Sequence, residues 1–265
     1  MKTQITKIAM MLGVFMINFG MHAHAAILPL NGPEILKGAE LTFAENKCQI
    51  KDFSGKLNKK VLFLAQADNM KYLFRKDGIS MQLAKPAQTM EVLSDDKVIS
   101  IQSPAVYQKL EISFEGMNRD ADLYGAEEFR TVTFKNDISN CQTRNFRKLY
   151  YTEMYPGIDL RYSDFDARLK YEFIVQPGFN YQEIRMKIDS AKEISINNLG
   201  QLVINTATGD LVEDAPIAIQ EGKPLLVKWV VDQQTVSFRV LNPDSSKELY
   251  IQSSFQFNRS LEPKI

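Results

Sequence analysis

The chain has 265 residues, of which 45% are hydrophobic and 24% are charged, and its 32 basic side chains balance its 32 acidic ones. A nearly neutral chain with interspersed charges gives no electrostatic case for binding nucleic acid or an anionic membrane. Its two histidines, His22 and His24, lie in a segment that we expect to be removed. This excludes Ser-His-Asp catalysis, Cys-His catalysis and histidine-based zinc sites in the mature protein.

Residues 1–25 have the features of a signal peptide. Two lysines begin the segment, an apolar run covers residues 8–19, and Ala23-His24-Ala25 has the small-x-small pattern of a cleavage site. The run is shorter than the roughly 20 residues that span a membrane, and no later run approaches that length. We therefore expect an exported protein, periplasmic, cell-surface or extracellular, whose mature chain has no transmembrane segment.

The mature chain shows the spacing of an all-β protein. Residues 26–40 read as an irregular lead-in with several Pro and Gly residues. Turn signals then recur about every 8–12 residues, which is typical of short antiparallel strands. The predicted strands before residue 140 cover residues 61–65, 71–75, 79–83, 90–93, 98–102, 107–115 and 131–134. Residues 116–130 are polar and predict a long loop.

The clearest element is a hairpin over residues 155–178. Apolar and charged residues alternate strictly on both sides of a polar turn at residues 163–166, and alternation of this kind is the period of a half-buried strand. Pro-Gly pairs mark both of its ends. The expected register places three pairs opposite each other, Leu160 with Phe173, Arg161 with Glu172, and Tyr162 with Tyr171.

Further strands are predicted after this hairpin. They cover residues 184–188, 194–197, 201–205, 210–213, 216–220, 225–231, 236–240 and 249–257. The turn-rich segment 135–145 is the best candidate for a boundary. We therefore expect an all-β fold of two β-sandwich-like halves, residues 41–140 and 141–265, with little helix.

Carboxylates are the catalytic groups that remain. Asp159 and Glu172 lie on neighbouring strands of the hairpin and are the best candidate pair for a glycosidase, which needs two carboxyl groups roughly 5–10 Å apart. Both are at outward positions, where solvation alone accounts for a charge. Asp164 and Asp166 at the hairpin tip are a candidate calcium site, but calcium would need several further oxygen ligands that the sequence does not supply, and a plain turn is the simpler explanation. No metal cluster or cofactor motif appears, and we expect neither.

Aromatic side chains and cysteines are the other notable residues. The aromatics that cluster between residues 150 and 181 offer rings that could stack on sugars, although the alternation places Tyr162, Tyr171 and Phe173 in the core. Cys48 and Cys141 are too few for a thiolate cluster. In an oxidising compartment a single disulfide is the simplest reading, but sequence alone leaves free thiols open.

Several of these motifs together resemble a known family. They are ENKCQ near residue 45, LEISFEG at 110–116, FKND at 134–137, YPGIDLRY, LKYEFIVQPG, and GQLVINTATGDLVEDAP at 200–216. The chain is similar over nearly its whole mature length to a domain of unknown function (DUF7948-like). This domain stands at the N-terminus of large secreted bacterial surface proteins that carry SBBP repeats, PKD domains or gliding-motility-type C-terminal modules. The resemblance implies no catalytic residues.

Three departures from this family bear on the expectations. Cys48 stands where the family usually has Gly, and Cys141 lies close to a usual Trp, which favours a disulfide between the two. The sequence also stops at Ile265 without repeats or a sorting module, so we expect the module alone.

The sequence thus favours an exported, non-catalytic binding or structural module of the cell envelope or surface that contacts a surface protein or a glycan. The alternative is a carboxylate-dependent carbohydrate-active enzyme.

Overall fold

A computed structural model describes residues 40–258 apart from residues 53, 68–69, 86–87, 95–96 and 136–139. The expected signal peptide and nearly all of the lead-in lie outside the described residues. The strands before the long hairpin that crosses residue 140 are β1 (Phe43–Glu45), β2 (Phe63–Ala67), β3 (Met70–Arg75), β4 (Gly78–Lys85), β5 (Gln88–Ser94), β6 (Lys97–Ser103) and β7 (Val106–Phe114).

The remaining elements follow from that hairpin to the end of the described chain. They are β8 (Asp122–Lys135), β9 (Asn140–Tyr155), β10 (Ile158–Phe165), β11 (Arg168–Val175), η1 (Tyr181–Glu183), β12 (Met186–Asp189), β13 (Glu193–Ile196), β14 (Leu202–Asn205), β15 (Asp210–Glu213), β16 (Ile217–Gln220), β17 (Lys223–Leu225), β18 (Val227–Asp232), β19 (Thr235–Val240) and β20 (Leu249–Asn258). The all-β prediction is confirmed: within the described residues the single 3₁₀ turn η1 is the only helical element. None of the described helical structure has the length and apolar character needed to cross a membrane.

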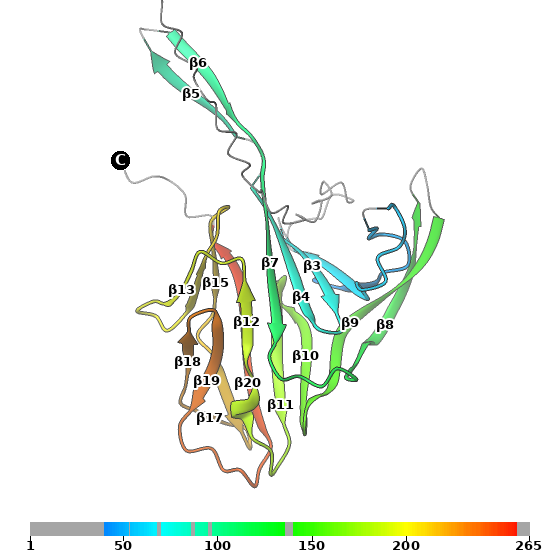
Figure 1. Cartoon of the computed structure of the whole chain (residues 1–265), viewed down its shortest axis with the longest axis vertical. Coiled ribbons are helices and arrows are strands. Elements are labelled where there is room, and N and C mark those ends of the chain that lie inside the picture. The colour runs from blue at the N-terminus through cyan, green and yellow to red at the C-terminus, as the bar shows by residue number, and fades with distance from the viewer. Residues whose placement is uncertain are drawn as a thin grey trace, which may run out of the picture.

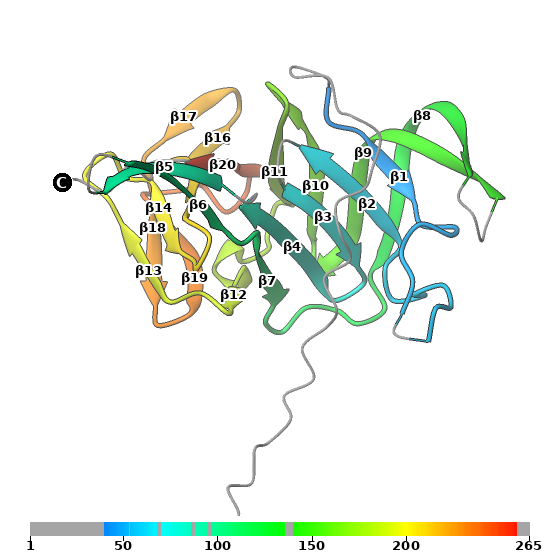
Figure 2. The ribbon, with the colours of Figure 1, turned by 90° about the horizontal axis from the view of Figure 1, so that it is seen from above.

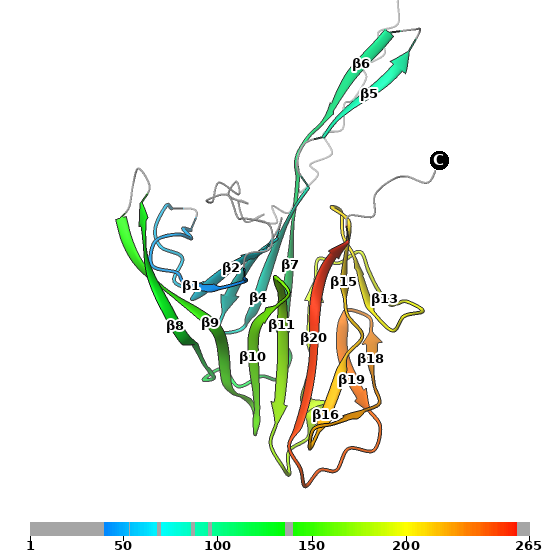
Figure 3. The same cartoon turned by 180° about the vertical axis from the view of Figure 1, so that it is seen from behind.

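The strands form an antiparallel sheet that curls almost into a barrel-like sandwich (Figures 1 and 2). One wall runs in the order β1-β2-β3-β4-β7-β12-β19-β18. The other runs β8-β9-β10-β11-β20, and β1 also pairs with β9, which joins the two walls. Beyond β11, one edge of β20 pairs with both β16 and β15 (Figure 3).

The core lies between these walls and is rich in aromatic side chains. Phe74 on β3 meets Tyr162 on β10 with ring centroids 5.1 Å apart, and Phe114 on β7 meets Phe173 on β11 at 6.3 Å. All four side chains are at most 5% exposed. Edge-on aromatic pairs of this kind add about 0.5–1.5 kcal/mol beyond the area that they bury. The alternating residues of the two walls therefore interdigitate across one common core.

The central hairpin is confirmed as strands β10 and β11. The register pairs Leu160 with Phe173, Arg161 with Glu172, and Tyr162 with Tyr171, as the alternation predicts. The turn is tighter than expected, because pairing continues to Phe165 opposite Arg168 and leaves only Asp166 and Ala167 between the strands. Both turn residues have positive φ values, 54° and 58°, which match the right-handed twist of a two-residue hairpin.

The prediction of a loop at residues 116–130 is wrong for most of that segment. β8 begins at Asp122 and pairs with β9 as far as Lys135, opposite Asn140. Side chains such as Tyr124 and Phe129 are exposed there, because this hairpin extends past the core and has no face fully covered. Alternation is therefore weak in this strand. The same hairpin crosses residue 140, and the division into two halves at that point stays a prediction.

Two further features stand out from the body of the sheet. The hairpin β5–β6 continues the β4–β7 ladder as a separate two-stranded ribbon and projects from one end of the molecule (Figures 1 and 3). Cys48 and Cys141 form a disulfide with Cα atoms 6.3 Å apart. It fastens the segment that follows β1 to the start of β9, so the pairing favoured by the sequence is present.

Candidate binding site

The predicted carboxylate pair lies on the outer face of the central hairpin, and each member has a partner of its own. Glu172 forms an ion pair with Arg161, its neighbour across the strands. Its side chain is only 8% exposed, so the expectation that solvation accounts for its charge is wrong. Its strand, β11, lies between β10 and β20 in the sheet. Asp159 accepts a 2.7 Å hydrogen bond from the Glu153 amide and thereby fastens the β9–β10 turn. A catalytic role for this pair stays a prediction.

The predicted calcium ligands also have structural surroundings. Asp164 lies on β10 and accepts a 2.9 Å hydrogen bond from the Leu41 amide, which fixes the start of the described chain. Asp166 is exposed in the two-residue turn. Among the described residues, no group of three or more His, Cys, Asp or Glu side chains comes together as a metal site. The calcium hypothesis stays a prediction.

Sequence reasoning missed a buried acid, Glu213 on β15, which is 1% exposed. Burial raises its pKa to about 8, and the nearby Asp214 raises it too, while hydrogen bonds from Tyr171 and Ser253 oppose this shift. The Tyr171 hydroxyl donates to the carboxyl Oε1 and ties β15 to β11. Leu211, two residues earlier, is also buried, so the period of the strand could have flagged Glu213 as inward. Without solvent contact, this acid holds strands together rather than meeting a ligand.

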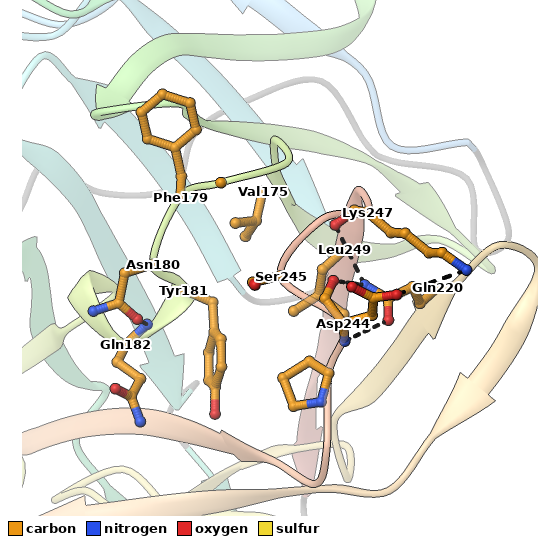
Figure 4. A pocket seen from close by; sticks show the side chains of 12 residues that line it. Val175, Phe179, Asn180, Tyr181, Gln182, Gln220, Asp244, Ser245, Lys247 and Leu249 are labelled. Atoms are coloured by element: carbon orange, nitrogen blue, oxygen red, sulfur yellow. Dashed lines mark hydrogen bonds and ion pairs between the residues drawn. The ribbon is translucent and has the colours of Figure 1, made fainter.

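An open hollow of about 390 Å³ lies between the segment that follows β11 and the segment that precedes β20 (Figure 4). In Figure 1, these ends of β11 and β20 lie opposite the β5–β6 ribbon. We call this hollow the β11–β20 pocket; residues 175, 178–182, 220, 243–245, 247 and 249 line it. Asn180, Tyr181 and Gln182 stand on one side and Gln220, Asp244 and Lys247 on the other (Figure 4). The first group follows β11 and the second flanks β20, and β11 and β20 pair directly.

Internal hydrogen bonds fix both walls of the β11–β20 pocket. The buried Gln220 side chain donates to the Asp244 carbonyl at 3.0 Å and accepts from the Asp244 amide at 2.9 Å. The Gly178 amide donates to the Ser245 carbonyl at 2.7 Å, which joins the two loops. The Tyr181 hydroxyl bonds the backbone of Val240. The hollow is therefore held in shape before any ligand arrives.

The groups that remain available in this pocket are one aromatic ring and side-chain amides. Phe179 is 45% exposed, but its ring points away from the other lining side chains (Figure 4) and packs over Gly157, where an added Cβ would lie 2.2 Å from it. Tyr181 therefore supplies the aromatic surface of the pocket. The Gln182 side chain is exposed and makes no hydrogen bond to another described residue. The charges are already balanced, since Lys247 pairs with Glu221 at 2.6 Å and Asp244 accepts from Ser246. The lining therefore suits a neutral polar ligand with a flat apolar side.

Comparison with known proteins yields one family. The model for the domain of unknown function DUF7948 matches residues 43–252, which is most of the chain. No curated protein and no solved structure gives a significant match.

Proposed function

The chain belongs to the family of the domain of unknown function DUF7948. We propose from the geometry that it is an exported, non-catalytic binding module, and that it holds a neutral sugar unit of a surface glycan in the β11–β20 pocket. The proposal includes a place in the cell envelope or at the surface, alone or beside SBBP-, PKD- or gliding-motility-type modules. The features of residues 1–25 and the resemblance of the motifs support that location.

The combination of an aromatic ring and amides on a fixed frame carries this proposal. Ligand sites are concave, mostly apolar and largely pre-formed, with a few polar groups that set orientation. A sugar ring has one apolar face and a rim of hydroxyls, so the Tyr181 ring matches the face while Gln182 matches the rim. Fixed walls reduce the entropy that binding costs, since the loops are ordered in advance.

Titration calorimetry with neutral oligosaccharides of glucose, mannose, galactose and N-acetylglucosamine tests the proposal. At least one should bind, and Gln182→Ala should weaken it about two- to tenfold, the range for one lost hydrogen bond. Gln142→Ala, at an exposed position on β9 far from the pocket in sequence, is the matched control and should bind like the parent. Absence of binding across the panel, or equal affinity of the Gln182 variant and the parent, would refute the proposal.

A further inference from the structure

A second and larger hollow of about 760 Å³ is rimmed by basic side chains. We call it the basic pocket. Its rim carries Lys59 and Lys60 from the segment before β2, Lys76 from the β3–β4 turn, and Arg119 from the β7–β8 loop. Three chain segments thus bring four cations to one opening. The β3–β4 turn and the β7–β8 loop lie at the end of the sandwich opposite the β5–β6 ribbon (Figure 1).

These four cations lack acidic partners among the described residues, whereas the fifth cation of the lining is neutralised. Arg75 pairs with Asp77 at 2.9 Å and with Glu111 at 2.7 Å, and its side chain is only 16% exposed. None of the described ion pairs includes a cation of the rim. The rim is therefore a local excess of positive charge in a chain whose net charge is zero.

The backbone that carries these cations is fixed. The Asn118 amide donates to the Met154 carbonyl at 2.8 Å, and the Asn118 side chain donates to the Glu153 carbonyl, which holds the β7–β8 loop against β9. The Asn46 side chain donates to the carbonyls of Asn58 and Val61 and holds the turn that carries Lys59 and Lys60. Cations held together in this way repel each other until an anion lies between them. A concave, pre-formed rim of one charge raises the local concentration of anions.

We propose that the basic pocket binds an acidic polysaccharide through carboxylate or sulfate groups spaced along its chain. Apolar anchoring contributes little here, because Phe114 is 5% exposed and Leu62 and Met117 are partly buried in the core surface. This favours a ligand recognised by repeated charge over an acidic peptide, which would also seek pockets for its apolar side chains. The site is separate from the β11–β20 pocket, so the neutral-sugar proposal can fail while this one holds.

The test compares binding of oligogalacturonate, a carboxylated glycan, and heparin hexasaccharide, a sulfated one, with binding of neutral galactan. At least one acidic glycan should bind at 50 mM salt and weaken clearly at 200 mM, because ion pairs at the surface are screened. Each single substitution, Lys59→Gln, Lys60→Gln, Lys76→Gln or Arg119→Gln, should weaken it about two- to fivefold, and the quadruple variant more than tenfold.

The control changes the same charge elsewhere. Replacement of Lys192, Lys223, Lys228 and Arg239 by Gln alters the net charge equally at exposed positions outside the basic pocket. This variant should bind the acidic glycan like the parent. Equal weakening of both quadruple variants, absence of binding to both acidic glycans, or tighter binding of a polyglutamate peptide or an oligonucleotide would overturn the proposal. Circular dichroism verifies that both quadruple variants fold. If the quadruple variant of the basic pocket does not fold, binding by the single Lys76→Gln variant tests the proposal instead.

Discussion

The buried carboxyl of Glu213 should make the stability of the protein depend on pH, and the substitution Glu213→Gln should remove that dependence. The pKa of this group is raised from its usual value of 4.5 to about 8 in the folded state. The folded protein therefore retains a proton that the unfolded chain releases. Its contribution to stability is fully present below pH 4.5 and is lost as the pH rises through 8. At 1.36 kcal/mol per pKa unit, the total loss is about 5 kcal/mol.

Urea unfolding at pH 5, 6, 7 and 8 measures this loss. Trp229 is the only tryptophan, is 2% exposed and donates to the Asp214 carbonyl beside Glu213, so its fluorescence reports the transition. The parent should lose about 1.4 kcal/mol of unfolding free energy per pH unit more than Glu213→Gln, whose amide does not titrate. Glu193→Gln, at an exposed position on β13, should keep the slope of the parent. Parallel pH profiles of the parent and Glu213→Gln would refute the reasoning.

Three further substitutions test the framework. Replacing Cys48 and Cys141 by Ala opens a loop of 93 residues. Relative to the oxidised parent, this should lower the unfolding free energy by up to about 4–5 kcal/mol. An unchanged urea midpoint would show that the bridge does not constrain the unfolded chain. Gly78 has a φ of 149°, and Gly78→Ala places a Cβ 2.1 Å from the backbone carbonyl oxygen of Ile112. The substitution should lower the unfolding free energy, measured by thermal unfolding, by about 2–4 kcal/mol. An unchanged stability would contradict this close approach. Glu172→Met leaves Arg161 without its carboxylate partner and should cost about 1–3 kcal/mol, less than a fully buried pair because Arg161 is partly exposed. The double variant with Arg161→Met should recover most of the loss, and additive losses in denaturant unfolding would count against the pair.

The central hairpin was predictable because its information is local. Period-two alternation and a Pro-Gly turn at each end determine which residues face the core, and the register follows from that constraint. The tip was predicted less well, since Ser163 to Phe165 are polar or exposed and still pair as strand. Backbone pairing continues there without a buried face.

β8 shows where this reasoning fails. Its residues extend past the core, so no apolar period is needed, and a polar strand reads like a loop. Glu213 shows the opposite case. The period of its strand indicates that it faces inward, but the sequence does not show which side chains form hydrogen bonds with a buried acid there. Tyr171 lies on a strand 42 residues away in sequence. Only the curling of the sheet brings it to the carboxyl.

The sequence by itself determined the all-β class and the central pairing, and it limited any internal disulfide to Cys48 and Cys141, because each depends on alternation or on the identity of a few residues. The tertiary structure decided where ligand-sized hollows exist and which charges surround them. Lys59, Lys76 and Arg119 are separated along a chain whose charges cancel, and a net charge averages over positions that folding keeps apart. The electrostatic character of a surface depends on distances in space, and these arise only when the two walls of the sheet close on their common core.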